Sequence, residues 1–238
     1  MGKAARDYYK NRSEKSSASY RRVHDDRLES ARGRLEEAEA RLRDGRVIRV
    51  DLPDSEVPRG RVVLSTDGLV LRTGASVDLE LRGPERVAVV GPNGAGKTTL
   101  LETVAGLVAP LAGSAVVHVP FGLLPQRLDV LDEDLSVADN VHDRARLARF
   151  LFRGAAADRE VRTLSGGERF RATLASVLLA DPAPQLLMLD EPTNNLDLAS
   201  YDALVSALAD HRGALLVVSH DEHFLEDIGV ERRLVLAG

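Results

Sequence analysis

A glycine-rich stretch, RVAVVGPNGAGKTTL at residues 86–100, constrains the fold of this chain more than any other feature. It is typical of a strand, a turn and the start of a helix, and Gly91, Gly96, Lys97 and Thr98 fit the spacing G-x-x-x-x-G-K-[ST]. Glycines let the backbone wrap so that successive N–H groups point at a phosphate, and the following helix presents its positive end to the same anion. A chance glycine turn with this spacing is expected in roughly one chain in a hundred of this length. The stretch therefore predicts a phosphate-binding loop.

The loop gives its residues candidate roles. Lys97 is expected to neutralise the β- and γ-phosphates of a nucleotide, and the hydroxyl of Thr98 is expected to reach Mg²⁺. The residues expected to bind the nucleotide run along the loop: Gly91, Pro92, Asn93, Gly94, Ala95, Gly96, Lys97, Thr98 and Thr99.

A second stretch, LLMLDEPTNNLD at residues 186–197, changes from apolar residues to acids and amides. The apolar residues predict a buried strand, with Asp190 at its end holding Mg²⁺ directly or through water. Glu191 follows, and neighbouring side chains of a strand point to opposite sides unless the strand bends at its end. A carboxylate turned toward the phosphates can orient or deprotonate the attacking water. The alternative is a helix N-cap acid, which suits Glu191 better than Asp190.

From residue 61 onward, short β-branched runs alternate with helical stretches. This pattern predicts an α/β domain over 61–238 with a mainly parallel sheet. The ten residues before it, 51–60, contain two prolines and a glycine and predict a linker. The expected strands are Val62–Leu64, Val77–Leu81, Val87–Val90, Ala115–Val119, Leu186–Leu189, Leu215–Val218 and Leu234–Leu236.

The first 50 residues differ from the rest in charge and pattern. Apolar residues three and four apart predict one exposed helix over 20–45, with a seam suited to one arm of a helical hairpin. Residues 1–22 hold seven basic and two acidic side chains, a net charge of +5, although the whole chain carries −5. Such a charge split predicts a nucleic-acid partner for this basic helical arm, residues 1–50.

Several classes of protein are excluded or made improbable. The absence of cysteine excludes a disulfide scaffold and a thiolate metal site, and it fits a reducing, cytoplasmic location. The N-terminus lacks the apolar core of a signal peptide. Residues 103–126 carry no charge, but three prolines and three glycines interrupt them. They predict a helix end, a buried strand and a turn rather than a membrane span.

The stretch TLSGGERFRATLASVLLADPAPQLLMLDEPTNNLD, residues 163–197, resembles an ATP-binding cassette (ABC) ATPase. The resemblance spans 61–238 and implies ATP and Mg²⁺ as cofactors, ATP hydrolysis, and a P-loop NTPase fold with a helical subdomain near 128–183. It also implies that Gln126 contributes to catalysis and to the Mg²⁺ site. His220 is implied as a sensor of the γ-phosphate and Asp197 as part of the D-loop. The signature loop implied by the same resemblance is Ser165, Gly166 and Gly167.

The narrower resemblance is to the second cassette of ABC-F proteins, especially actinobacterial members implicated in antibiotic resistance. Those proteins join two cassettes by a helical linker, bind ribosomes and act in translation. The resemblance implies that the signature loop completes the site of an opposite cassette, in a homodimer or with a separate partner. It also implies that residues 1–22 contact rRNA and, at a tRNA site, tRNA. The alternatives are the ATPase subunit of an ABC exporter and a half-size fragment unable to hydrolyse ATP.

The sequence departs from the family pattern in four places. The chain starts within the linker, so the usual first cassette is missing, and it ends soon after its final strand. The stretch LVLRTGASVDLELRG, residues 69–83, lacks the aromatic residue that stacks on adenine, and apolar packing by Leu69 or Leu71 is the expected substitute. Residues 136–154 are short for the helical subdomain, which loosens the expected placement of Ser165.

The histidines other than His220 are expected to be ordinary surface or core residues. His211 is expected at the surface, as are His24 and His142, and His118 is expected to be buried within a strand. His220 and His223 have a spacing that could mimic a metal pair, but no cysteine or third ligand accompanies them, so a zinc site is not expected.

Overall fold

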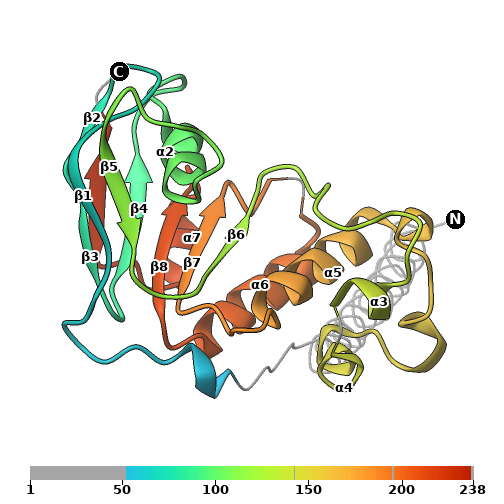
Figure 1. The fold of residues 1–238 in the computed structure, drawn as a ribbon. Coiled ribbons are helices and arrows are strands. Elements are labelled where there is room, and N and C mark those ends of the chain that lie inside the picture. Colours follow the sequence, from blue (N-terminus) through green and yellow to red (C-terminus); the bar gives the residue numbers. More distant parts are fainter. Residues whose placement is uncertain (1–51, 142, 195, 237–238) are drawn as a thin grey trace, which may run out of the picture. The chain divides into compact units, whose positions relative to one another are not determined.

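The computed structural model describes residues 52–141, 143–194 and 196–236 (Figure 1). The chain divides into two compact units, Met1–Arg46 and Val47–Gly238, and the described residues all lie in the second. The predicted helix over 20–45, the basic residues 1–22, His24 and His142 lie outside the described residues.

The central sheet has five parallel strands in the order β6-β7-β8-β4-β9. Apolar runs build its middle, where every residue of β7 and β8 is buried, because layers cover both faces of the sheet. The predicted α/β fold with a mainly parallel sheet is confirmed. The strands are β6 (Phe121–Leu124), β7 (Leu186–Asp190), β8 (Ala214–Val218), β4 (Arg86–Val90) and β9 (Arg232–Val235).

A smaller antiparallel sheet lies beside the central one (Figure 1). Its long strand β1 pairs with the other three strands. β5 is a strand within the uncharged stretch 103–126, as predicted, but it is not buried: four of its six residues are exposed and the other two are half-exposed. Ala115 and Val117 of β5 pack against the core cluster, whereas Val116 between them is 46% exposed, so the strand has one covered and one open face. The strands are β1 (Val62–Val70), β2 (Ser76–Val77), β3 (Glu80–Arg82) and β5 (Ala112–Val117).

Helices cover the central sheet and extend beyond it. Figure 1 shows α5 and α6 running from the sheet toward α3 and α4. The described helices are α2 (Lys97–Val104), α3 (Val137–Val141), α4 (Arg144–Leu147), α5 (Gly166–Leu178), α6 (Leu198–Asp210) and α7 (Glu222–Asp227). Short 3₁₀ turns are η1 (Pro53–Ser55), η2 (Ala148–Phe150), η3 (Gly154–Ala156) and η4 (Val161–Thr163). Among the helices of the described residues, none has both the length and the apolar character to cross a bilayer.

Strand β7 shows how one apolar run serves two cores. Leu187 and Leu189 belong to the cluster that includes buried residues of α5 and α6, whereas Leu186 and Met188 belong to the cluster under α2 and the antiparallel sheet. This division follows from the period of two along a strand. Both faces of the strand are therefore fixed, which holds its carboxyl end in place.

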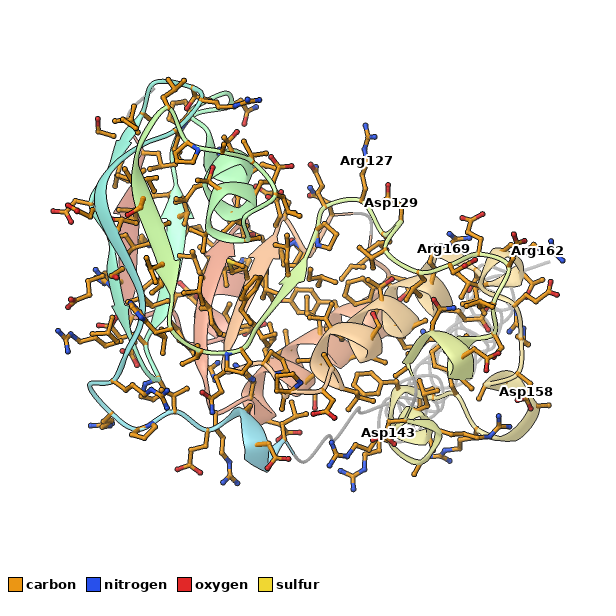
Figure 2. The ribbon with its side chains drawn as sticks, viewed as in Figure 1. Arg127, Asp129, Asp143, Asp158, Arg162 and Arg169 are labelled. Atoms are coloured by element: carbon orange, nitrogen blue, oxygen red, sulfur yellow. The ribbon has the colours of Figure 1, made fainter. Side chains whose placement is uncertain are left out.

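The helical subdomain predicted near 128–183 falls between β6 and β7, where α3, α4, η2–η4 and α5 lie. Charged side chains on its surface pair with one another: the exposed Arg162 lies 3.1 Å from Asp134 and the half-buried Arg169 lies 2.5 Å from Glu133, and Figure 2 labels both arginines. Exposed pairs of this kind contribute only about 0–1 kcal/mol each. The buried rings of Phe150 and Phe170 therefore do more to fix α5 on the subdomain.

Two histidine expectations are wrong. His211 is 2% exposed, and burial, together with the nearby Arg86 charge, lowers its pKa to about 4. It is the C-cap of α6, with an extended backbone, and the pattern of the helix gives no reason to bury it. His118 is exposed and lies just after β5, with Nε2 2.9 Å from the hydroxyl of Ser65.

Candidate active site

The predicted phosphate loop connects β4 to α2. Gly96 is the N-cap of α2, with φ of 97°, and a Cβ there would lie 2.5 Å from Oγ1 of Thr73. Gly91 has φ of 155°, and a Cβ there would lie 2.5 Å from the carbonyl oxygen of Leu236. Both positions therefore need glycine for conformation and for space. The backbone of the loop runs directly into the N-terminus of α2, and a helix N-terminus favours an anion.

Lys97 folds back across this loop. Its ammonium donates hydrogen bonds to the carbonyl oxygens of Gly91 at 2.8 Å and Pro92 at 3.1 Å. The residue is only 8% exposed. A buried ammonium held by neutral carbonyls is stabilised further by a negative charge, so the arrangement fits a phosphate in the loop.

Asp190 ends β7 beside the loop. It is 3% exposed, and its Oδ1 has no hydrogen-bond partner among the described residues. Burial raises the pKa of this carboxyl, and a hydrogen bond from Thr98 and the charge of Lys97 partly offset that rise. An unpaired buried carboxylate oxygen beside a hydroxyl is costly by itself but forms a donor set that Mg²⁺ prefers. These residues fit a magnesium ion.

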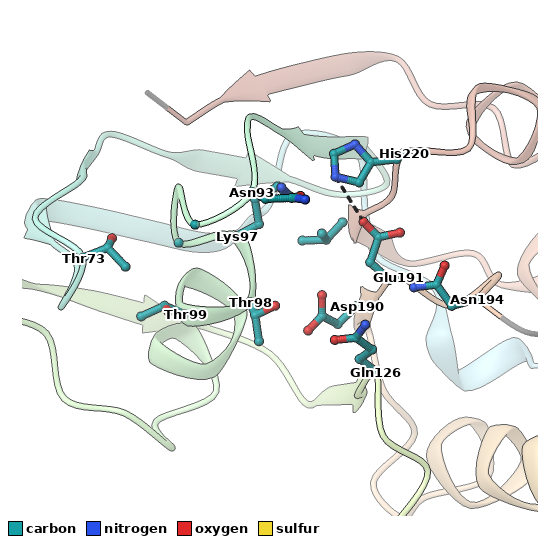
Figure 3. A pocket seen from close by; sticks show the side chains of 13 residues that line it. Thr73, Asn93, Lys97, Thr98, Thr99, Gln126, Asp190, Glu191, Asn194 and His220 are labelled. Carbon is teal, nitrogen blue, oxygen red and sulfur yellow. Dashed lines mark ion pairs between the residues drawn. The ribbon is translucent and has the colours of Figure 1, made fainter. Parts of the chain in front are cut away.

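Glu191 occupies a bend directly after β7. Its φ of 46° lies in the left-handed region, and its N–H donates to the carbonyl of Val218 at 2.8 Å. This bend is the feature needed to bring two consecutive carboxylates to one side, and Figure 3 shows both facing the pocket. The N-cap alternative does not hold for either acid, because the next helix, α6, is capped by Asp197.

His220 follows β8 and faces Glu191. Its Nε2 lies 3.5 Å from Oε1 of Glu191 (Figure 3). The histidine side chain is 56% exposed and the glutamate side chain 15%. The imidazole can therefore contact both the carboxylate and a group that enters the pocket.

These side chains surround one pocket of about 530 Å³. Gln126, just after β6, brings a third strand end to the same wall as Asp190 (Figure 3). The predicted residues that line the pocket are Asn93, Gly94, Gly96, Lys97, Thr98, Thr99, Gln126, Asp190, Glu191 and His220. Of the other predicted loop residues, Gly91, Pro92 and Ala95 shape the loop without lining the pocket.

Sequence reasoning missed three residues that line the pocket: Thr73, Asn194 and Val218. Asn194 is in the stretch of acids and amides, so its polarity was a usable signal. Thr73 is in a short turn, and nothing in its spacing links it to the loop. Leu69 and Leu71, expected to pack on a base, are 1% and 0% exposed and do not line the pocket. That expectation is wrong because both side chains belong to the core beneath the antiparallel sheet.

The predicted signature loop lies apart from this pocket, at the start of α5. Ser165 is the N-cap of α5 and forms a capping box: the Ser165 N–H donates to Glu168 at 2.9 Å and the Glu168 N–H to the serine hydroxyl. Arg159 donates to the other carboxylate oxygen of Glu168 at 2.6 Å. The Ser165 backbone and Arg159 together lower the pKa of Glu168 to about 2. Despite the short subdomain, the cap of α5 is held by charge as well as by packing.

The signature loop adjoins the predicted D-loop. A Cβ on Gly167 would lie 3.1 Å from Oδ2 of Asp197, so these two segments form one exposed surface. Ser165, Gly166 and Asp197 are exposed. The structure does not bring them into the pocket of their own chain.

Comparisons with known proteins agree with this geometry. A family model described as "ABC transporter" matches residues 75–194, about half of the chain. The "Probable ATP-binding protein YheS" of Haemophilus influenzae is 38% identical over 174 residues, which cover 68% of this chain and 27% of the relative. "ABC transporter F family member 5" of Arabidopsis thaliana is 34% identical over 165 residues, covering 63% of this chain and 24% of the relative.

A solved structure extends the likeness to the fold. A metal-chelate type ABC transporter in an inward-facing conformation has a TM-score of 0.63 and 27% identity, and the match covers 74% of this chain and 80% of that one. The chain spans about a quarter of the length of the curated relatives named above. Because the family model covers half of the chain and the phosphate loop and acids form one pocket, the chain belongs to the ABC transporter family, as an ATP-binding domain.

Proposed function

We propose that this chain binds and hydrolyses ATP in the cytoplasm and acts on the ribosome as an ABC-F-type protein. Membership of the family implies ATP binding and ATPase activity. The observation that carries the proposal is the single pocket in which the phosphate loop faces Asp190, Glu191 and His220.

Six residues of the pocket have a role in the proposed hydrolysis. ATP supplies the bond that is broken, and Mg²⁺ when bound neutralises phosphate charge. Lys97 binds the terminal phosphates, and Thr98 with Asp190 holds the metal. Glu191 orients the water and accepts its proton. Gln126 and His220 contribute to positioning at the metal and at the γ-phosphate.

We propose that a second cassette, either a second copy or a separate chain, completes this site. Ser165 and Gly166 are exposed and lie outside the pocket of their own chain, yet the capping box presents their backbone in a fixed orientation. The N-terminus of a helix favours a phosphate. Head-to-tail pairing would place this surface against the phosphates of the partner cassette, so that ATP joins the two faces and hydrolysis releases them.

The ribosome is the proposed target for two reasons. Residues 1–22 carry a net charge of +5 in an otherwise acidic chain, which favours contact with rRNA or tRNA phosphates. Two plant relatives are named as members of an ABC transporter F family, and the resemblance of this chain to ABC-F proteins implies ribosome binding. The role within translation is either that of a translation factor or that of ribosome protection against antibiotics.

Sedimentation with ribosomes tests the proposal. The Glu191→Gln chain should sediment with ribosomes in the presence of ATP and much less without it, because the closed state accumulates when hydrolysis is blocked. Adding Arg21→Ala and Arg22→Ala should weaken this sedimentation while leaving ATP binding unchanged. If the Glu191→Gln chain stays in the supernatant with and without ATP, action on the ribosome is wrong.

A second candidate function is the ATPase subunit of an exporter. The similarity to the metal-chelate type transporter, with a TM-score of 0.63, favours it. This function predicts copurification with a membrane protein and no response to ribosomes. A third outcome, nucleotide binding without turnover at high protein concentration with and without ribosomes, would identify the chain as hydrolysis-incompetent.

A further inference from the structure

The histidine that faces Glu191 lies just before the short helix α7 (Figure 3). His220 stands between Ser219 and Asp221, and Asp221 is the N-cap of α7, where its carboxylate accepts the N–H of Phe224 at 3.1 Å. The N–H of Asp221 donates in turn to the hydroxyl of Ser219 at 3.1 Å. Because these bonds join the segment 219–221 to the first turn of α7, a shift of this helix also shifts the imidazole.

One tyrosine of α6 holds α7 at two points. The hydroxyl of Tyr201 donates to Oδ2 of Asp227, the last residue of α7, at 2.7 Å. The ring of Tyr201 packs edge-on against that of the buried Phe224, with the centroids 6.1 Å apart and the planes at 66°. Edge-to-face pairs are a favoured aromatic geometry. The aromatic pair therefore fixes the middle of α7, and the hydrogen bond fixes its end.

The half-buried phenol of Tyr201 is held as a hydrogen-bond donor. Burial, followed by the hydrogen bond to Asp227, raises the pKa of Tyr201 above its ordinary value, so the group stays protonated at neutral pH. A carboxylate acceptor also makes the bond stronger than one between two neutral groups. The link between α6 and α7 is therefore directional as well as apolar.

Tyr201 is itself fixed in the first turn of α6. Its N–H donates to the carbonyl oxygen of Asp197 at 3.0 Å, and Oδ1 of Asp197 accepts the N–H of Ser200 at 2.7 Å. A side-chain cap of this kind stabilises the first turn of a helix. The start of α6 is therefore a fixed base from which Tyr201 can hold α7.

We propose that Tyr201 is a positioning residue for hydrolysis: by holding α7 against the capped start of α6, it keeps the imidazole of His220 beside Glu191. The inference rests on the proposed ATP hydrolysis and adds to it a residue outside the pocket. Tyr201 does not line the pocket, so it acts through His220 and not on the nucleotide. A small displacement of a group at the reacting centre lowers the rate strongly, which is why one remote hydroxyl can matter.

Removal of that hydroxyl tests the proposal in the full chain. Tyr201→Phe keeps the ring on Phe224 but releases the end of α7, so kcat for ATP should fall about fivefold while KM stays within about twofold of the parent. Asp227→Ala should give the same loss. Asp227→Asn should keep at least about half of the parental kcat, because its amide oxygen accepts the same hydroxyl. Glu226→Ala is the matched control: Glu226 is the exposed neighbour of Asp227 on α7, and its kcat should equal that of the parent.

The same change in the His220→Ala chain shows whether Tyr201 acts through the imidazole. There Tyr201→Phe should leave kcat unchanged to within about 1.5-fold, because the group that it positions is absent. An equal fractional loss with and without His220 would assign the effect to the stability of the fold and overturn the inference, as would a parental kcat in Tyr201→Phe. In both cases hydrolysis by the parent leaves the proposed function standing. A parent that hydrolyses no ATP overturns the proposed function and the inference with it.

Discussion

Nε2 of His220 lies 3.5 Å from Oε1 of Glu191, although the two residues follow different strands. β7 and β8 are parallel neighbours, and Asp190 pairs with Val218 in their register. The segments that follow these two strands therefore leave the sheet side by side. The left-handed bend at Glu191 then turns its carboxylate toward the imidazole. The pairing of the two strands, rather than closeness in sequence, therefore brings these two side chains together.

Glu191→Gln should abolish hydrolysis while leaving nucleotide binding intact. The amide fills the same space and keeps one oxygen, but it cannot accept a proton from water. General-base removal costs about 10²–10⁴-fold in rate, so we expect a loss of at least about a hundredfold in kcat. Phosphate release measures the rate and calorimetry the affinity.

Glu222→Gln is the control for this change, because Glu222 is an exposed acid on α7 that pairs with Arg233 away from the pocket. Its rate should equal that of the parent. A parental rate in Glu191→Gln would mean that another group activates the water.

His220→Ala should lower kcat more than it raises KM. The imidazole contacts Glu191 and reaches the pocket, so its loss frees the carboxylate without removing a group that holds the phosphates. A hydrogen bond to a charged group contributes about 1.5–3 kcal/mol, which corresponds to roughly tenfold or more in rate.

The neighbouring His223 supplies the comparison, since it is exposed on α7 and does not line the pocket. His223→Ala should behave as the parent does. Equal losses in both variants would assign the effect to the stability of α7 and not to the pocket.

The strand at Leu186–Asp190 and the loop ending at Thr98 could be predicted from sequence because their signals are local. An apolar run followed by acids, and glycines at a fixed spacing, carry their own geometry. The proximity of Glu191 to His220 could be expected only through resemblance, since it depends on strand order. β4 pairs with β8 and β9, which lie more than a hundred residues further along the chain.

The segment 69–83 shows where local signals fail. The predicted strand Val77–Leu81 is split into β2 and β3 because the side-chain hydroxyl of Thr66 accepts the N–H of Leu79 at 2.8 Å, in place of a backbone carbonyl. No pattern within 77–81 shows this long-range contact. Leu69 and Leu71 likewise read as free to meet a base, yet the sheet directs both into the core. Thr73 was missed because its position beside Gly96 of the phosphate loop also depends on a contact between segments that are distant in sequence.

Glu168 should make the start of α5 sensitive to acid. Its pKa in the folded protein is about 2, below the usual 4.5, because the Ser165 N–H and Arg159 bind the carboxylate. A lowered folded pKa contributes stability that is present above about pH 4.5 and lost as the pH falls toward 2. Glu168→Gln should therefore lower the free energy of unfolding by roughly 1 kcal/mol at neutral pH and by less at pH 3.

Urea unfolding at pH 7 and pH 3 measures the difference between the parent and Glu168→Gln. Glu160→Gln is the comparison, because Glu160 also pairs with an arginine, Arg162, but does not cap α5. A difference between parent and Glu168→Gln that stays the same at both pH values would exclude the ionised capping box as its source.

Gly166→Asp should separate nucleotide binding from pairing of two cassettes. A Cβ at Gly166 meets nothing within 4 Å, and the residue is exposed, so the substitution adds negative charge without disturbing the fold. The signature loop lies outside its own pocket, so ATP affinity should stay within about twofold of the parent, a change below about 0.5 kcal/mol. The added carboxylate would face the phosphates bound by a partner and repel them. Introduced together with Glu191→Gln, it should convert an ATP-dependent dimer to a monomer by light scattering, with Glu191→Gln alone as the control. A dimer that persists with Gly166→Asp would show that the signature loop is not part of the paired surface.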